Sequence, residues 1–190
     1  MSGRVTVSGG AVLLLGVLIF VLRPAELAAL LLAAAAHEVG HLAALLLLRG
    51  RVRGVAFTVS GPVIRCDVPP RAAARCLAAL AGPAAGIGLF WALRARYPLA
   101  AELSLLLSGV NLLPVLPLDG GRVLQAALEG LCGARSSLGA LEALGFFVPV
   151  ALMALGLCAV RVGYGLSVVA FGAWLLLLQP ESLVNPAGMM

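Results

Sequence analysis

Long apolar stretches, each broken by only a few charged side chains, dominate this sequence. The hydrocarbon core of a lipid bilayer is roughly 30 Å thick, so a helix needs about 20 mainly apolar residues to cross it. The 190 residues are 62% hydrophobic and only 11% charged, whereas about a quarter of the residues in a soluble domain are charged. The composition therefore predicts a membrane protein. No polar linker divides the chain, so we expect a single domain over residues 1–190.

Six segments have the length and apolar character of membrane spans. They are Val5–Leu22, Pro24–Leu48, Ala72–Leu93, Tyr97–Leu118, Leu138–Val160 and Val162–Leu178. We therefore predict an all-α, polytopic membrane helix bundle of about six transmembrane spans. The last two must turn within Val160–Gly165, which makes their boundary the least defined. The first segment also has the form of a signal peptide, although no small-residue cleavage site precedes the next span.

The segment Arg51–Pro70, between the second and third expected spans, is the longest one without a helical pattern. It is rich in residues that favour strands, and Gly61-Pro62 interrupts it as a turn would. The strand-favouring residues are Val52, Val55, Phe57, Val59, Val63 and Ile64. We predict a short β-hairpin at the membrane surface.

Neither the basic residues nor the cysteines form a cluster. All 13 basic residues are arginines, scattered between apolar runs, which argues against a nucleic-acid partner. Nine of the 13 arginines fall on the N-terminal side of the membrane if six spans alternate, so we expect both termini in the cytoplasm. The four cysteines, Cys66, Cys76, Cys132 and Cys158, lack a C-x-x-C spacing, which favours small buried hydrophobes over metal ligands.

The two histidines of the chain, His37 and His41, flank Glu38 within the second expected span. Helical residues four apart lie on one face, about 6 Å apart along the axis, so both imidazoles can share one tetrahedral zinc ion. The intervening glutamate can then act as general base on the water that the metal activates. Ionisable groups in mid-span are costly unless a partner or a cavity compensates them. The pattern therefore predicts a metal site.

A catalytic zinc site usually has a third protein ligand, and the chain offers two aspartates, Asp67 and Asp119. Asp67 lies in the expected hairpin region. Asp119 ends an apolar stretch that Pro114 and Pro117 break, and Gly120-Gly121 follow it. Irregular backbone at membrane depth survives only where it is buried in protein or lines a wet cavity. We therefore favour Asp119 as third ligand, with a simple helix cap before residues 120–130 as the alternative.

Together, His37-Glu-Val-Gly-His41 and Asn111-x-x-Pro114-x-x-x-x-Asp119-Gly resemble the motifs of the site-2 protease family of intramembrane zinc metalloproteases. The sporulation-type branch, which processes membrane-tethered pro-sigma factors, is the most similar. The resemblance spans roughly Leu22–Leu128. It implies that His37, His41 and Asp119 bind one zinc ion and that Glu38 is the general base. It further implies that Asn111 holds substrate or stabilises the oxyanion and that Pro114 shapes the loop.

The third expected span departs from the family pattern. Ala81-Gly-Pro-Ala-Ala-Gly86 is similar to the family's Gly-Pro-x-x-Asn segment, but glycine replaces the asparagine at Gly86. Gly82 and Gly86 could form a helix-packing face or support the site, and the sequence leaves both open. We expect neither a PDZ nor a CBS domain, which leaves control to a separate membrane regulator.

The function expected from this resemblance is zinc-dependent endoproteolysis in or near a transmembrane segment, as in regulated intramembrane proteolysis. The substrate would be a membrane-tethered protein such as a pro-sigma or anti-sigma factor. The run Val52–Ile64 would offer a strand edge for pairing with it, at Val55, Phe57 and Val59. Two alternatives are a membrane ion transporter and a zinc-binding homologue without catalysis. A transporter should carry polar residues on several spans, and the fifth and sixth offer almost none.

Overall fold

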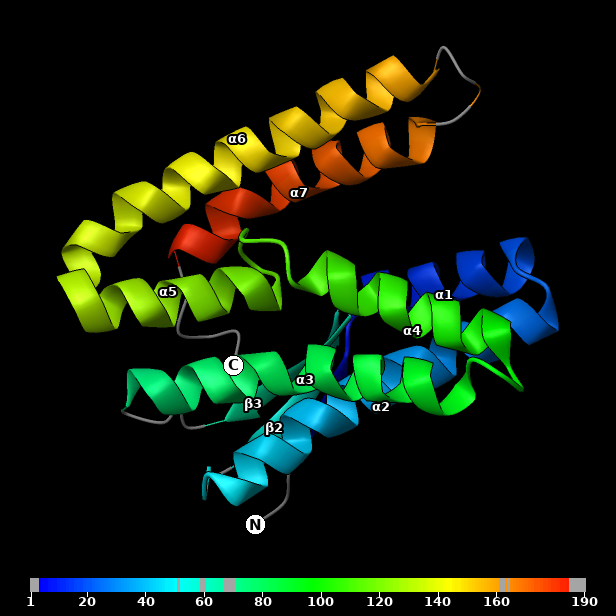
Figure 1. Cartoon of the computed structure of the whole chain (residues 1–190), viewed down its shortest axis with the longest axis horizontal. Helices are drawn as coiled ribbons and strands as arrows, with labels where there is room; N and C mark the ends of the chain where they lie inside the picture. Colours follow the sequence, from blue (N-terminus) through cyan, green and yellow to red (C-terminus); the bar gives the residue numbers. More distant parts are fainter. Residues whose placement is uncertain are drawn as a thin grey trace.

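A computed structural model describes residues 4–50, 52–58, 61–66, 71–160, 163 and 165–184 of the chain. The described part contains seven helices and a three-stranded sheet (Figure 1). The helices are α1 (Gly9–Val21), α2 (Pro24–Leu47), α3 (Ala72–Leu93), α4 (Pro98–Asn111), α5 (Asp119–Cys132), α6 (Ala134–Val160) and α7 (Leu166–Val184). The strands are β1 (Arg4–Val7), β2 (Val52–Thr58) and β3 (Gly61–Cys66).

Helices α2 and α3 pack closely through residues with small side chains. The buried residues of α2 recur at four-residue spacing, which places them on one face. They are Ala29, Ala33, His37 and Leu45. On α3 the buried set is Ala78, Ala79, Gly82, Pro83 and Gly86. A Cβ atom on Gly40 would lie 2.4 Å from the carbonyl oxygen of Ala81, so the two backbones approach as closely as glycine allows.

Helix α4 packs against α3 through two buried serines. The Ser104 hydroxyl lies 2.8 Å from the Ala101 carbonyl oxygen and 3.1 Å from that of Gly86, on the neighbouring helix. The Ser108 hydroxyl donates to the Ser104 carbonyl oxygen at 2.7 Å. These bonds satisfy both hydroxyl groups inside an apolar contact, which is the condition for burying them.

Helix α5 lies along the N-terminal half of α3 and is joined to it by polar contacts (Figure 1). Arg75 Nη1 lies 2.8 Å from Glu129 Oε2, and Gln125 Nε2 donates to the other carboxylate oxygen of Glu129 at 2.9 Å. Helices α6 and α7 run side by side, with close contacts at Gly156, Gly165 and Gly172. Along the chain, α6 and α7 follow α5, the helix that begins with Asp119.

The sheet has the order β1-β2-β3, with β1 parallel and β3 antiparallel to β2. Val55 lies opposite Val5 on one side and Ile64 on the other. Strand β2 is therefore central, and both of its edges are occupied. Val55 and Phe57 therefore have no free edge on β2, because Val5–Val7, predicted to begin the first span, belong to β1 and pair with β2. Val59 lies outside the described residues, and the location of the strands at the membrane surface stays a prediction.

Among the described residues, three helical stretches are long and apolar enough to cross a membrane: Pro24–Leu47, Ala72–Leu93 and Ser137–Val160. The apolar helices Gly9–Val21 and Leu166–Leu178 are shorter. The fourth expected span ends early, because α4 stops at Asn111 and the chain is irregular before α5 begins at Asp119. Pro114 and Pro117 lie in that irregular segment, where proline cannot continue a helix. A count of six spans stays a prediction.

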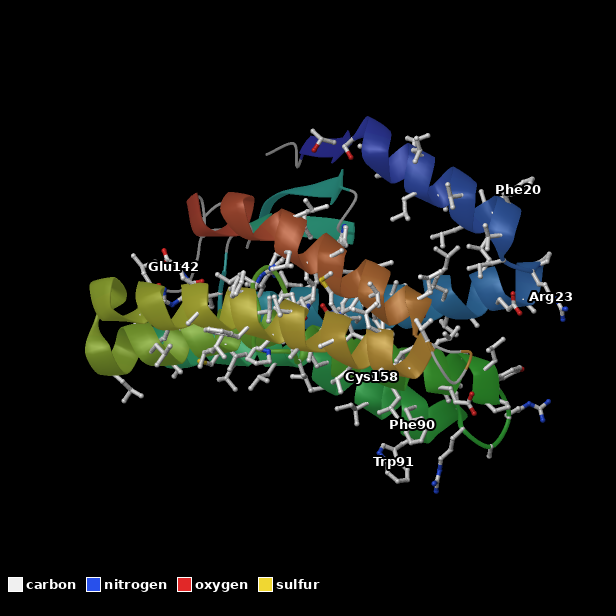
Figure 2. All side chains as sticks on the ribbon, turned by 90° about the horizontal axis from the view of Figure 1, so that it is seen from above. Phe20, Arg23, Phe90, Trp91, Glu142 and Cys158 are labelled. Carbon is white, nitrogen blue, oxygen red and sulfur yellow. The ribbon has the colours of Figure 1, made fainter. Side chains whose placement is uncertain are left out.

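Large apolar side chains cover much of the surface, as expected for contact with lipid tails. Helix α1 has no buried residue, and Phe20 near its end is 92% exposed. Figure 2 shows α1 set apart from the α6–α7 pair, with Phe20 and Arg23 near its junction with α2. Phe90 and Trp91 project from α3 in the same view. A soluble monomer rarely exposes apolar surface to this extent.

The close approach of α2 and α3 predicts a difference between two glycine-to-alanine substitutions. Gly40→Ala should lower the thermal unfolding temperature in detergent, because the new methyl group meets the backbone of α3. Gly88→Ala is the matched control, since nothing lies within 4 Å of its Cβ position. The control should be neutral or stabilising, because alanine is favoured over glycine by about 1 kcal/mol in a helix interior. An unfolding temperature of Gly40→Ala at or above that of the wild type would contradict the packing described here.

Candidate metal centre

Helix α2 presents His37 and His41 on the face that it buries against α3. The four-residue spacing continues the stripe of Ala29 and Ala33, so both imidazoles turn inward roughly midway along the helix. His37 is only 4% exposed. The two Nε2 atoms lie 3.1 Å apart, and the ring planes are inclined at 78°. Both rings thus direct the same nitrogen toward one point.

Asp119 reaches this point because the chain folds back between α4 and α5. Val115, Leu116 and Leu118 of the connecting segment are buried and anchor it. A Cβ atom on Gly120 would lie 2.2 Å from the carbonyl oxygen of Leu112, and one on Gly121 would lie 2.4 Å from the carbonyl carbon of Val115. Only glycine permits α5 to begin this close to the preceding loop. Asp119, 4% exposed, is then held against the two histidines.

The Asp119 carboxylate does not cap its helix. The N-cap of α5 is Leu118, which makes no side-chain capping bond. Oδ2 of Asp119 lies 3.0 Å from His37 Nε2 and 3.1 Å from His41 Nε2. Oδ1 lies 3.5 Å from Nη1 of Arg122, one turn further along α5. The carboxylate is therefore directed at the histidines, which argues against the helix-cap alternative.

The three donor atoms form a triangle that suits a tetrahedral metal ion. Their separations are 3.0, 3.1 and 3.1 Å. Ligands at zinc–nitrogen and zinc–oxygen distances of roughly 2.0 to 2.1 Å would be about 3.3 Å apart in a tetrahedral site. Two imidazole nitrogens and one carboxylate oxygen are a donor set that zinc accepts, and they leave the fourth position open. His37, His41 and Asp119 could hold a metal ion.

Contacts behind these donors favour metal binding. Nδ1 of His41 donates to the Ala78 carbonyl oxygen at 2.8 Å, which leaves the Nε2 lone pair directed at the site. A carboxylate ligand must be ionised, and the Arg122 guanidinium 3.5 Å from Asp119 Oδ1 favours that form. Nδ1 of His37 is buried and has no hydrogen-bond partner among the described residues.

Glu38 lies beside the donor triangle without being part of it. Its side chain is half-buried and lies within electrostatic range of His41, His37, Asp119 and Arg122. Because Glu38 follows His37 directly, its side chain is rotated by about 100° around the helix relative to that imidazole. The carboxylate is thus near the metal position and free of metal-ligating contacts in the described structure, as a general base requires.

Other predicted site residues lie elsewhere or make different contacts. Asn111 ends α4, and its amide donates to the Leu107 carbonyl oxygen at 3.0 Å, so its described hydrogen bond is to its own helix. Pro114 lies in the loop before α5. Val55 and Phe57 belong to the central strand β2. The substrate roles of these four residues stay predictions, and Val59 and Asp67 lie outside the described residues.

Sequence reasoning did not select two of the groups that contact the ligands, Arg122 and the Ala78 carbonyl group. Arg122 could have been noticed, because an arginine three residues after Asp119 lies on the same helix face. The Ala78 carbonyl group that accepts from His41 carries no sequence signal, because any residue type provides a carbonyl oxygen. Its position depends on how α3 packs on α2.

The chain is similar to a peptidase family and to a solved protease structure. The sequence profile of peptidase family M50 matches residues 89–156, which include the loop before α5 and Asp119. A search of curated proteins finds no match. The solved structure of the site-2 protease from Methanocaldococcus jannaschii is similar, with a TM-score of 0.72 over 95% of this chain and 91% of that chain. The two sequences are 20% identical, so this likeness concerns the fold alone.

The arrangement predicts different metal contents for substitutions at Asp119 and Glu38. Asp119→Ala should lose zinc, because two histidines alone leave the ion underligated. Asp119→Asn should retain an intermediate amount, since it keeps an oxygen donor but not the charge. Glu38→Gln should bind zinc like the wild type. The measurement is bound zinc per chain in purified, detergent-solubilised variants. Full zinc content in Asp119→Ala would mean that the third ligand is another residue, with Asp67 as the next candidate.

Proposed function

We propose that this chain is a zinc-dependent intramembrane endopeptidase of the M50 type. The observation that carries the proposal is the triangle of His37, His41 and Asp119 donors in the middle of an apolar bundle, with Glu38 beside it. The profile match and the shared fold support it from independent directions. The finer proposal of a sporulation-type enzyme rests on the spacing of Asn111, Pro114 and Asp119.

The chemistry requires one acid–base residue beside the metal. When bound, zinc supplies Lewis-acid activation of the attacking water and of the scissile carbonyl group. Glu38 accepts a proton from the water and then donates it to the leaving amine. Its half-buried position keeps the carboxylate close to the histidines while leaving it reachable from outside the triangle. Arg122 holds the far oxygen of Asp119, which keeps the other oxygen directed at the metal position.

The substrate must present extended backbone to this site. A transmembrane helix of a substrate cannot unwind in lipid without losing its hydrogen bonds, so another segment must replace them. Strand β3 has β2 on one side, and its other edge has no partner strand in the described part of the chain. We therefore assign the β-addition to β3 instead of β2. A membrane-tethered protein, such as a pro-sigma or anti-sigma factor, is the substrate class that this geometry would serve.

Cleavage of a single-span substrate co-expressed with the chain tests the proposed activity. Glu38→Gln should reduce cleavage at least about 100-fold, because general acid–base catalysis contributes 10²- to 10⁴-fold and the amide cannot accept the proton. Glu142→Gln is the matched control, since Glu142 is an exposed glutamate on α6. The control should cleave at the wild-type rate. Normal cleavage by Glu38→Gln would exclude the proposed mechanism.

Proline scanning of β3 tests the assignment of the free edge. Backbone N–H groups of successive strand residues point to opposite edges, so Val63→Pro and Ile64→Pro remove donors from different sides. The substitution that removes a donor facing β2 should lower the unfolding temperature. The other should keep stability and bound zinc but slow cleavage. If the stable variant cleaves at the wild-type rate, the substrate does not pair with β3.

A further inference from the structure

We propose that Gly82 is a positioning residue for the metal ligand His41, and that the turn Ala78–Gly82 of α3 sets both the location and the tautomer of that imidazole. The inference rests on the proposed metal site. It concerns α3. The sequence pattern leaves open whether Gly82 and Gly86 of this helix pack against other helices or support the site.

The first step is the hydrogen bond that selects the tautomer. A neutral imidazole has one N–H group, and the nitrogen without a proton is the one that can bind a metal. Nδ1 of His41 donates to the Ala78 carbonyl oxygen at 2.8 Å, so the proton resides on Nδ1. Nε2 is left with its lone pair, 3.1 Å from Asp119 Oδ2. His37 lacks such a partner for Nδ1 among the described residues, so α3 performs this task for His41 alone.

The second step is the space that Gly82 leaves for the ring. Gly82 lies one turn after Ala78 on α3, and it is buried. A Cβ atom on Gly82 would lie 2.2 Å from Nε2 of His41, 2.6 Å from Cε1 and 2.7 Å from Cδ2. The imidazole therefore occupies the volume in which any other residue would place its side chain. The ring packs against α3 at Gly82, which has no side chain, and its Nδ1 atom faces the Ala78 carbonyl oxygen.

The other tightly packed glycines of these helices have different neighbours. A Cβ atom on Gly40 would meet the backbone of Ala81, and one on Gly86 would meet the Ser108 hydroxyl at 2.2 Å. Gly40 therefore governs the distance between α2 and α3, and Gly86 governs packing against α4. Of these three glycines, Gly82 alone has a metal-ligand ring at its Cβ position. The glycines of this face thus have different roles, and only Gly82 supports the site.

The atoms near Gly82 also determine how the protein would respond to a methyl group there. They belong to the end of a side chain, which can rotate, whereas those nearest Gly40 are the Ala81 carbonyl group and the Cβ atom of Ala85, which cannot. In Gly82→Ala the His41 ring should therefore swing away while the helices keep their places. That movement separates Nε2 from Asp119 Oδ2 and breaks the Nδ1 bond to Ala78. Loss of such supporting contacts typically weakens metal affinity 10- to 100-fold.

The experiment compares Gly82→Ala with Gly86→Ala in the full-length, detergent-solubilised chain. Both add a methyl group to the same face of α3, with the same 2.2 Å separation from a polar side-chain atom. The readouts are the zinc dissociation constant from chelator competition and the absorption spectrum of the Co²⁺-substituted protein. We expect Gly82→Ala to bind zinc at least about tenfold more weakly and to alter the Co²⁺ spectrum. Gly86→Ala should leave both unchanged. Wild-type affinity and spectrum in Gly82→Ala, or equal losses in both variants, would overturn the proposal.

A second measurement uses the wild type and so does not depend on how any variant folds. The chain has only two histidines, so ¹⁵N-histidine labelling gives two imidazole spectra, and His41→Asn assigns them. In the zinc-loaded protein we expect the His41 proton on Nδ1, protected from solvent exchange by the Ala78 carbonyl group. A proton on Nε2 would overturn the proposal. Neither the zinc affinity nor the tautomer is measured through cleavage. The role of Gly82 can therefore be tested even if the chain does not cleave a substrate.

Discussion

The contact between α2 and α3 is the constraint on which the rest of the structure depends. Gly40 of α2 lies against the backbone of Ala81 and the side chain of Ala85 on α3, and His41 of α2 lies against Ala78 and Gly82. In an apolar bundle, helices gain little from excluding lipid and associate through close van der Waals packing. This closeness lets a carbonyl group of α3 reach the ring of His41 on α2. A wider spacing would remove the hydrogen bond between His41 Nδ1 and the Ala78 carbonyl oxygen.

The second requirement is that irregular backbone be tolerated inside the bundle. The segment between α4 and α5 carries Pro114 and Pro117, and its buried residues pack against the helices around it. Backbone groups that leave a helix in a membrane protein must be covered by protein or water. The glycines after Asp119 allow this cover by bringing the loop into contact with the start of α5. The third donor therefore reaches the site from a different part of the chain than the first two.

These features give the site a consistent chemical character. Each of the three donors is buried or nearly so, and the Asp119 carboxylate lies between the two histidines and Arg122. Glu38 is less buried than His37 and is not among the three donors. The separation of ligands from base follows from helix geometry, since adjacent residues point in different directions while residues four apart align. A metal and a proton acceptor can thus share one turn of α2 without competing.

The sequence by itself predicted the helical, apolar class and the pairing of His37 with His41, and it favoured Asp119 over Asp67. Each depends on local information: apolar length, the four-residue helical repeat, and proline and glycine positions. The tertiary structure decided what depends on contacts between distant segments. Residues 4–7 form β1 and pair with β2, so this edge of β2 is occupied. The Ala78 carbonyl oxygen and Gly82 became supports of His41 only through helix packing. Every residue has a backbone carbonyl group, and every glycine lacks a side chain, so neither feature marks a position in the sequence. Only the fold shows that Ala78 and Gly82 contact His41.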